Sequence, residues 1–292
     1  MKHLLIAVAV ATMLASCEKN VNFNLKHTNE LLVVDANIEN GSVPVVVLTN
    51  SLQYFDRLSL ADLSSTFVHN AVVSISSGNT IWLLKEYTYS IPGGVNIYFY
   101  SIDSANLSTS SLGKFNTTYL LQIESKGKRY TAFTTIPSPS QKIDTLFSKP
   151  ATMGLPSDVV VFVKTADPPG LGNYTRYFTR KNQDLYLPGE TSVASDELID
   201  GTSFELEVKP GVDRNAIPPF KTYSFRKGEV VTYKLCNIDK ASYDFWNTWE
   251  FAYQSNGNPF AQPNKVKGNI SNGALGAFYG YAAEYKTITI PL

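Results

Sequence analysis

The chain has few of the residue types that most enzyme sites require. It contains two cysteines and three histidines in 292 residues, and no HExxH, paired CxxC or GxSxG motif occurs. The standard zinc and serine-hydrolase signatures are therefore absent. His27 and His69 lie far apart in the sequence, and we interpret both as residues of solvated loops. We predict no catalytic residue, no cofactor and no metal site, and expect the chain not to be an enzyme.

An excess of charge of one sign is also missing. The 25 lysines and arginines balance 25 aspartates and glutamates, and loss of Lys2 with an N-terminal segment would leave a net charge of about −1. Nucleic acid is excluded as a partner because its phosphates require a basic face. A polybasic membrane patch is excluded for the same reason. With 43% hydrophobic and 17% charged residues, the chain is globular rather than disordered.

The N-terminus carries the most specific signal. Lys2 precedes an apolar run over 4–13, which is shorter than the roughly 20 residues needed to cross a bilayer. This pattern predicts a secretory signal peptide over 1–16. Leu14-Ala15-Ser16-Cys17 resembles a bacterial lipobox, in which the cysteine takes a diacylglycerol and the peptide is cut before it. We therefore predict lipidation of Cys17, anchoring to the outer membrane through the acyl chains, and a short polar tether over 17–26.

The second cysteine is left without a partner if Cys17 is lipidated. Cys236 lies in an apolar, alternating segment, where a cysteine is typically a small buried side chain rather than a reactive thiol. We therefore predict no disulfide.

Alternating hydrophobic and polar residues predict an all-β protein. Leu32, Val34, Ala36 and Ile38 share one face of a strand, and six further short strands follow before residue 136. Seven short strands in about a hundred residues suggest an immunoglobulin-like β-sandwich over 27–136. Two prolines in 137–142 interrupt the pattern and predict a linker. The alternative is a loop inside one larger sandwich.

The second half, 143–292, predicts a β-sandwich or barrel-like domain carrying one helix. Its expected strands include a near-continuous apolar run over 158–165, which is typical of a strand covered on both faces, and a final strand over 281–290. Residues 239–254 contain no glycine or proline, and Asp239 is placed to cap a helix there.

Aromatic residues on this helix are the candidates for binding. Phe245 and Trp249 fall on the face expected to pack on the sandwich. Tyr243, Trp246 and Tyr253 fall on the opposite face and are our candidates for contact with a ligand or protein partner. The alternative is that the aromatics fill the contact between helix and sandwich, which we favour for Trp246 and Trp249.

An acidic stretch lies between Lys181 and Phe204. Clustered carboxylates can hold calcium, but the spacing matches no EF-hand loop, and we interpret the stretch as a solvated loop. Its acidic residues are Asp184, Glu190, Asp196, Glu197 and Asp200.

An ordered set of short motifs resembles DUF4249, a family of uncharacterised Bacteroidota lipoproteins. Together with the lipobox and the β-rich first half, these motifs cover almost the whole chain. They are Asp167-Pro168-Pro169-Gly170 with Asn173-Tyr174, Ile199-Asp200-Gly201, Ile238-Asp239-Lys240 with Tyr243-Asp244-Phe245-Trp246, Asn258-Pro259-Phe260, and Asn272-Gly273-Ala274-Leu275-Gly276-Ala277-Phe278. The resemblance implies an outer-membrane lipoprotein associated with TonB-dependent receptors, and it implies no catalytic residues.

These observations lead to one main hypothesis and two alternatives. We expect a non-enzymatic, lipid-anchored cell-envelope protein that assists a TonB-dependent outer-membrane transporter in nutrient uptake, by docking on it or presenting ligand. Exposure on the cell surface is favoured over the periplasmic face. The alternatives are a structural or adhesive surface module and a carboxylate-dependent hydrolase of extracellular glycan or peptide.

Overall fold

The computed structural model describes residues 30–52, 64–91, 95–108, 111–214, 216, 222–256, 262 and 264–292. The predicted signal peptide, Cys17, the tether and His27 lie outside the described residues. Within the described part, no helix is both long enough and apolar enough to cross a membrane.

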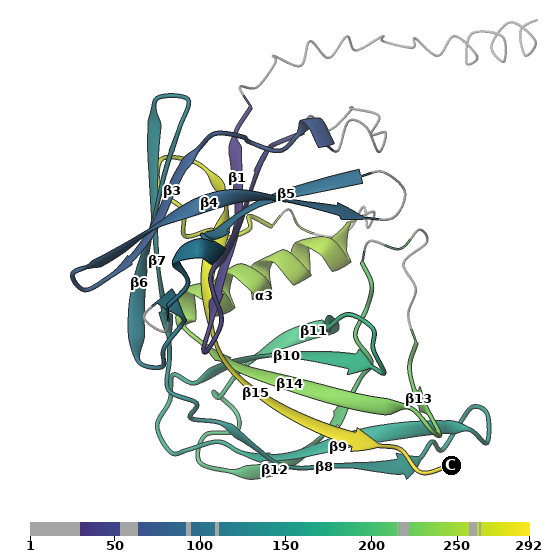
Figure 1. Cartoon of the computed structure of the whole chain (residues 1–292). Coiled ribbons are helices and arrows are strands. Elements are labelled where there is room, and N and C mark those ends of the chain that lie inside the picture. Colours follow the sequence, from purple (N-terminus) through teal and green to yellow (C-terminus); the bar gives the residue numbers. More distant parts are fainter. Residues whose placement is uncertain are drawn as a thin grey trace, which may run out of the picture. The chain divides into compact units, whose positions relative to one another are not determined.

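Most of the described chain forms β-strands, and the prediction of a mainly β protein carrying one helix is confirmed (Figure 1). The strands of the first half are β1 (Leu32–Glu39), β2 (Val45–Asn50), β3 (Val72–Ser77), β4 (Thr80–Ile91), β5 (Val95–Ile102), β6 (Thr117–Ser125) and β7 (Lys128–Ile136). A short 3₁₀ helix, η1, covers Ser104–Asn106.

The second half continues with strands and the long helix. Its elements are β8 (Lys142–Pro150), β9 (Asp158–Ala166), β10 (Tyr174–Lys181), β11 (Leu187–Ser195), β12 (Ser203–Val208), β13 (Phe225–Arg226), β14 (Val230–Ile238), α3 (Lys240–Ser255) and β15 (Leu275–Thr289).

Two sheets contain all the named strands. Eleven strands form one sheet in the order β11-β10-β14-β15-β1-β2-β5-β4-β3-β6-β7, and β12, β9 and β13 form a smaller sheet in which β8 also pairs with β9. Pairing is antiparallel except between β1 and β15, which run parallel. β7 is the last strand in this order, yet it packs against β15 in the middle of the order. The large sheet therefore folds back on itself.

The first core fills the inside of this folded sheet. Leu32, Val34, Ala36 and Ile38 of β1 are all buried in it, as the alternating pattern predicts. Phe278 and Ala282 of β15 enter the same core, so the last strand of the chain closes the structure built by the first half.

Two further cores belong to the second half. One lies between the smaller sheet and the alternating residues Val231, Tyr233 and Leu235 of β14. The other lies between α3 and the sheet, and it contains Phe245 and Cys236.

The boundary predicted at 137–142 coincides largely with the connection between β7 and β8. Strands from both sides of this connection nevertheless share one sheet through the pairing of β1 with β15. The division into two domains at this connection stays a prediction.

The helix begins as its sequence predicts. The Asp239 side chain accepts a hydrogen bond from the N–H of Ser242 at 2.8 Å, which satisfies one of the free donors of the first turn. The same carboxylate accepts from the N–H of Thr135 at 2.8 Å and the hydroxyl of Thr134 at 3.0 Å. The cap of α3 therefore also ties the helix to β7.

Several predicted strand assignments were wrong. β8 was not predicted, and residues 187–195, interpreted as part of an acidic loop, form β11. β15 starts at Leu275, although glycines suggested a bend there. Only a glycine fits at position 276 of this strand. Its φ is +90°, and a Cβ atom there would lie 1.9 Å from the carbonyl oxygen of Val34.

The apolar run of β9 is fully buried on one face only. Its buried residues alternate with residues that are intermediate or, at Lys164, exposed, contrary to the prediction of a strand covered on both sides. On the second face Phe162 stacks on Phe147 at 5.6 Å, and the Lys149 ammonium lies 4.7 Å from the Phe162 ring centre. Side chains of the neighbouring strand thus shield this face in place of a further layer.

Candidate functional site

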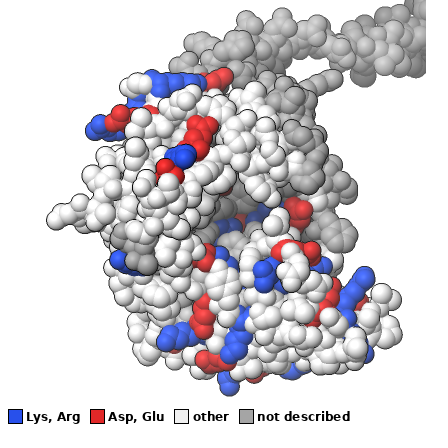
Figure 2. Space-filling view, viewed as in Figure 1, with Lys and Arg blue, Asp and Glu red and all other residues white. Residues whose placement is uncertain are grey.

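A pocket of about 1140 Å³ lies beside the parallel pair of β1 and β15. Figure 2 shows this face of the molecule hollowed, with basic side chains visible inside the hollow. Besides β1 and β15, the lining comes from β10, β11, β14, α3, residues 212–214 after β12, and the segment that precedes β15. Pockets that hold small molecules have volumes of roughly 300–1,000 Å³. The space is therefore sufficient for an organic ligand.

The two strands at its centre give opposite faces to the core and to the pocket. Side chains alternate along a strand, so Asp35, Asn37 and Glu39 of β1 point away from the first core and line the pocket. In the same way Tyr279 and Tyr281 of β15 line the pocket, whereas Phe278 and Ala282, which flank them on the other face of the strand, are buried in the first core. The pattern that builds the core also positions the site.

Arg176 of β10 is the most constrained charged group in the lining. Its side chain is only 3% exposed, and its guanidinium lies between two rings, 3.4 Å from the centre of Trp246 and 4.7 Å from that of Phe178. Its Nε donates to the Ser192 hydroxyl at 3.1 Å, and its Nη1 donates to the Tyr281 hydroxyl at 2.6 Å. Nη2 donates to no described residue. The guanidinium is thus rigidly held with one nitrogen left for a ligand.

Arg214 lies at the same end of the pocket and pairs with the Glu250 carboxylate, which is linked to Arg176 only through the Ser192 hydroxyl. The Glu250 carboxylate of α3, which is 3% exposed, accepts from the Ser192 hydroxyl and from Arg214 Nη2 at 3.3 Å. Across the lining, the four basic residues outnumber the three acidic ones by one; the basic residues are Arg176, Arg214, Lys234 and Lys265, and the acidic ones are Asp35, Glu39 and Asp213. Because an unbalanced buried charge is unfavourable, an anionic group is the ligand feature that fits this end.

The acidic groups of the lining are already engaged. Asp35 accepts from the Tyr279 hydroxyl, and Glu39 pairs with Lys234 and accepts from the Tyr285 hydroxyl. Burial raises the pKa of Tyr279, and the negative charge of Asp35 raises it further. Tyr279 therefore stays protonated and keeps donating to Asp35.

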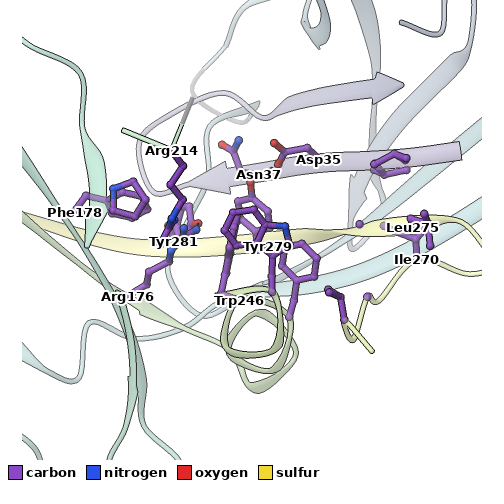
Figure 3. A pocket seen from close by; sticks show the side chains of 18 of the residues that line it. Asp35, Asn37, Arg176, Phe178, Arg214, Trp246, Ile270, Leu275, Tyr279 and Tyr281 are labelled. Atoms are coloured by element: carbon purple, nitrogen blue, oxygen red, sulfur yellow. Dashed lines mark hydrogen bonds between the residues drawn. The ribbon is translucent and has the colours of Figure 1, made fainter. Parts of the chain in front are cut away.

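The opposite end of the pocket is apolar. Ile270, Ala274 and Leu275 line it without any charged group among them. Figure 3 shows Arg176 and Arg214 near Tyr281 at one end, Trp246 and Tyr279 in the middle, and Ile270 with Leu275 at the other end. The arrangement suits an elongated molecule with an anionic head and an apolar or ring-containing body.

A family model described as a domain of unknown function, DUF4249, matches residues 18–287. The chain belongs to the DUF4249 family. No curated protein matches it. The match includes every residue of the pocket, so the site belongs to the family domain.

In this DUF4249 chain the three aromatic candidates lie in different surroundings. Trp246 lines the pocket and supports Arg176, and its Nε1 is buried without a hydrogen bond to the described residues. Tyr243 is outside the lining and packs on Tyr174 at 4.9 Å. Tyr253 is 36% exposed and stacks on Trp249 at 5.4 Å. A role in binding stays a prediction for all three.

Trp249 combines both interpretations of the helix aromatics. It packs in the core beneath α3, and it also lines the pocket. The structure therefore does not separate the helix into a core face and a binding face as the pattern suggested. The face that packs on the sheet is itself part of the pocket wall.

The sequence did not point to Arg176 or Arg214. Arg176 stands inside a predicted strand, where a long cationic side chain is usually taken to face solvent. Its partners come from residues 192, 246 and 281, so only the fold brings them together. The one available signal was an arginine flanked by strand-forming residues in a candidate strand.

The remaining predicted residues are not part of this pocket. Cys236 is fully buried and unpaired, as predicted, and burial raises the pKa of its thiol to about 12. His69 is exposed and pairs with Glu86 at 2.5 Å. Of the predicted acidic stretch, Asp196 is buried, whereas Asp184, Glu197 and Asp200 are exposed.

Proposed function

We propose that this protein binds a small anionic ligand in the pocket and presents it to a TonB-dependent outer-membrane transporter. Attached to the outer membrane through lipidated Cys17, it acts without catalysing a reaction. The observation that carries the ligand-binding part is Arg176, held between Trp246 and Phe178 with Nη2 left unengaged by the described residues. A purely structural or adhesive module would have no need of a buried cation facing a pocket.

The anchor and the receptor are supported by the sequence. Leu14-Ala15-Ser16-Cys17 supports lipidation, and the family resemblance supports association with a TonB-dependent receptor. Presentation at the membrane surface then gives the ligand a high local concentration at the transporter, because tethering converts a second encounter into an intramolecular one.

The geometry favours this function over hydrolysis by two carboxylates. Asp35 and Glu39 line the pocket, but they stand four residues apart on one strand, so their Cα atoms are about 13 Å apart. Catalytic carboxylates of glycosidases are separated by roughly 5–9.5 Å. Each is also engaged by a tyrosine hydroxyl, which leaves no obvious acid–base pair.

Isolation of the protein from its native membranes in mild detergent tests the transporter partnership. We expect a TonB-dependent receptor to co-purify with the wild type, and Cys17→Ala to be left in the unprocessed or soluble fraction without receptor. Arg176→Met provides the matched comparison, since it keeps the anchor and changes only the pocket. Recovery of the wild type without any such receptor under several growth conditions would contradict the partnership and leave ligand binding to be judged separately.

A further inference from the structure

A second cluster of chemistry-bearing side chains lies away from the pocket, in the loops that flank β9, β11 and β12. Asp167 follows β9, Asp196 follows β11, and Asp200 lies in the turn that leads into β12. One carboxylate oxygen from each lies within 4.8 Å of the other two. Pairing of β9 with β12 brings the first close to the others, because the N–H of Asp167 donates to the carbonyl of Thr202 at 2.9 Å.

Asp167 is the unusual member of the cluster. It is 3% exposed, and no hydrogen bond of standard geometry reaches either carboxylate oxygen within the described part of the chain; the nearby N–H of Gly201 is the one group that favours its charged form. A buried carboxylate without partners is strongly unfavourable, and two more carboxylates beside it add repulsion. Burial raises the pKa of Asp167, and the charges of Asp196 and Asp200 raise it further. The described residues therefore supply no counter-charge for this side chain.

The other two carboxylates are held in place by one loop. Asp196 Oδ2 accepts from the N–H of Asn173 at 2.8 Å and from its side-chain amide at 3.2 Å. Asp200 Oδ1 accepts from the N–H of Gly170 at 2.6 Å. The N–H of Gly172 in the same loop also favours the charged form of Asp196. One carboxylate oxygen from each of the three residues thus takes part in a preformed arrangement, within 4.8 Å of the other two.

We propose that Asp167, Asp196 and Asp200 form a calcium-binding site that joins the loop after β9 to the connection between β11 and β12. All the ligand atoms are oxygens, which suits a hard cation and not zinc. Ca–O bonds are about 2.3–2.6 Å long, so two oxygens on one calcium ion lie up to about 5 Å apart. A limit of 4.8 Å among the three carboxylates satisfies that condition. Calcium neutralises the buried charge of Asp167 and locks the two loops together.

Calorimetric titration of the full-length protein with calcium chloride, after treatment with EDTA and its removal, tests the site. We expect one calcium ion per chain, with a dissociation constant of about 10⁻⁴–10⁻³ M or below, as in extracellular modules. The midpoint of thermal unfolding is expected to rise by several degrees on addition of saturating calcium. Absence of both the binding heat and the thermal shift in the wild type would overturn the proposal. Equal affinity for magnesium would overturn the assignment to calcium.

Three variants sharpen the test. Asp200→Asn keeps the side-chain oxygen that accepts from Gly170 and is exposed, so the fold should survive while calcium affinity falls about tenfold or more. Asp167→Asn is expected to lose the calcium response and to unfold at a higher temperature than the wild type in EDTA, because the unpartnered charge is gone. Asp184→Asn, an exposed acid outside the cluster, is the control and should bind calcium like the wild type. A full calcium response in Asp200→Asn would contradict the site even if Asp167→Asn fails to fold.

Discussion

The two faces of β15 differ in composition and in the free energy of burying their surroundings. One face gives Phe278 and Ala282 to the first core, which consists of buried hydrophobic residues. The other gives Tyr279 and Tyr281 to a layer that also buries Arg176 and Glu250. Apolar burial stabilises the fold directly, whereas buried charges must first offset their desolvation. The comparison indicates that the first face of the strand maintains the fold and the second serves binding.

Phe278→Ala should have the largest effect on stability. Removal of a fully buried aromatic ring leaves a cavity in the first core and is expected to lower the free energy of unfolding by about 3–5 kcal/mol. Denaturant unfolding followed by fluorescence measures this loss. A loss below about 1 kcal/mol would mean that the first core does not depend on β15.

Glu250→Ala should come next, on the pocket side. It removes the carboxylate that Arg214 and Ser192 share, and it leaves the Arg214 guanidinium without its ion-pair partner. We expect a loss of about 3 kcal/mol, because breaking a buried pair exposes the cost of the remaining charge. The same unfolding experiment applies, and partial recovery in Glu250→Ala/Arg214→Met would identify charge as the cause. No recovery would point to packing of α3 instead.

Asp239→Ala should have an intermediate effect and tests the link between the two regions. The substitution removes the N-cap of α3 together with the hydrogen bonds from Thr134 and Thr135 of β7. A loss of about 1–2 kcal/mol is expected. Asp244→Ala on the same helix is the control, since it breaks only the exposed pair with Lys240 and should cost under about 0.5 kcal/mol. Equal losses in the two variants would contradict a linking role of the cap.

Arg176→Met should have the smallest effect on stability and the clearest effect on binding. Methionine retains much of the packing between Trp246 and Phe178 and removes a buried charge, so the unfolding free energy should change by less than about 1 kcal/mol or increase. A destabilisation of several kcal/mol would show instead that the arginine is structural. Denaturant unfolding of this variant beside Phe278→Ala measures the contrast between the two faces.

Local patterns in the sequence account for much of the fold. Alternation placed Leu32, Val34, Ala36 and Ile38 on the buried face of β1, and the Asp239 carboxylate caps α3 as its position predicted. These features depend on residues within a few positions of one another. They are therefore visible in one stretch of chain.

The misassigned strands lacked such a local pattern. β11 contains Pro188, Gly189 and Glu190, which are poor strand formers, and it is held by pairing with β10. The second residue of β15 is a glycine, Gly276, because the backbone passes close to Val34 there. In both places tertiary contacts override local preference.

The candidate sites depend on long-range convergence. Ser192, Trp246 and Tyr281 meet around Arg176, and Asp167 joins Asp196 and Asp200 across about thirty residues of sequence. No spacing rule connects positions that belong to different strands and loops. The acidic stretch between Lys181 and Phe204 was identified from the sequence. Asp167, which completes the proposed calcium site, lies outside that stretch.

The most direct test of the central claim is native mass spectrometry of the protein purified gently from its own cells. The account predicts one anionic small molecule bound to the wild type and to Lys149→Met, a substitution of an exposed lysine outside the pocket, and its loss from Arg176→Met. A wild type that carries no small molecule under any growth condition, or equal occupancy in Arg176→Met, would contradict it.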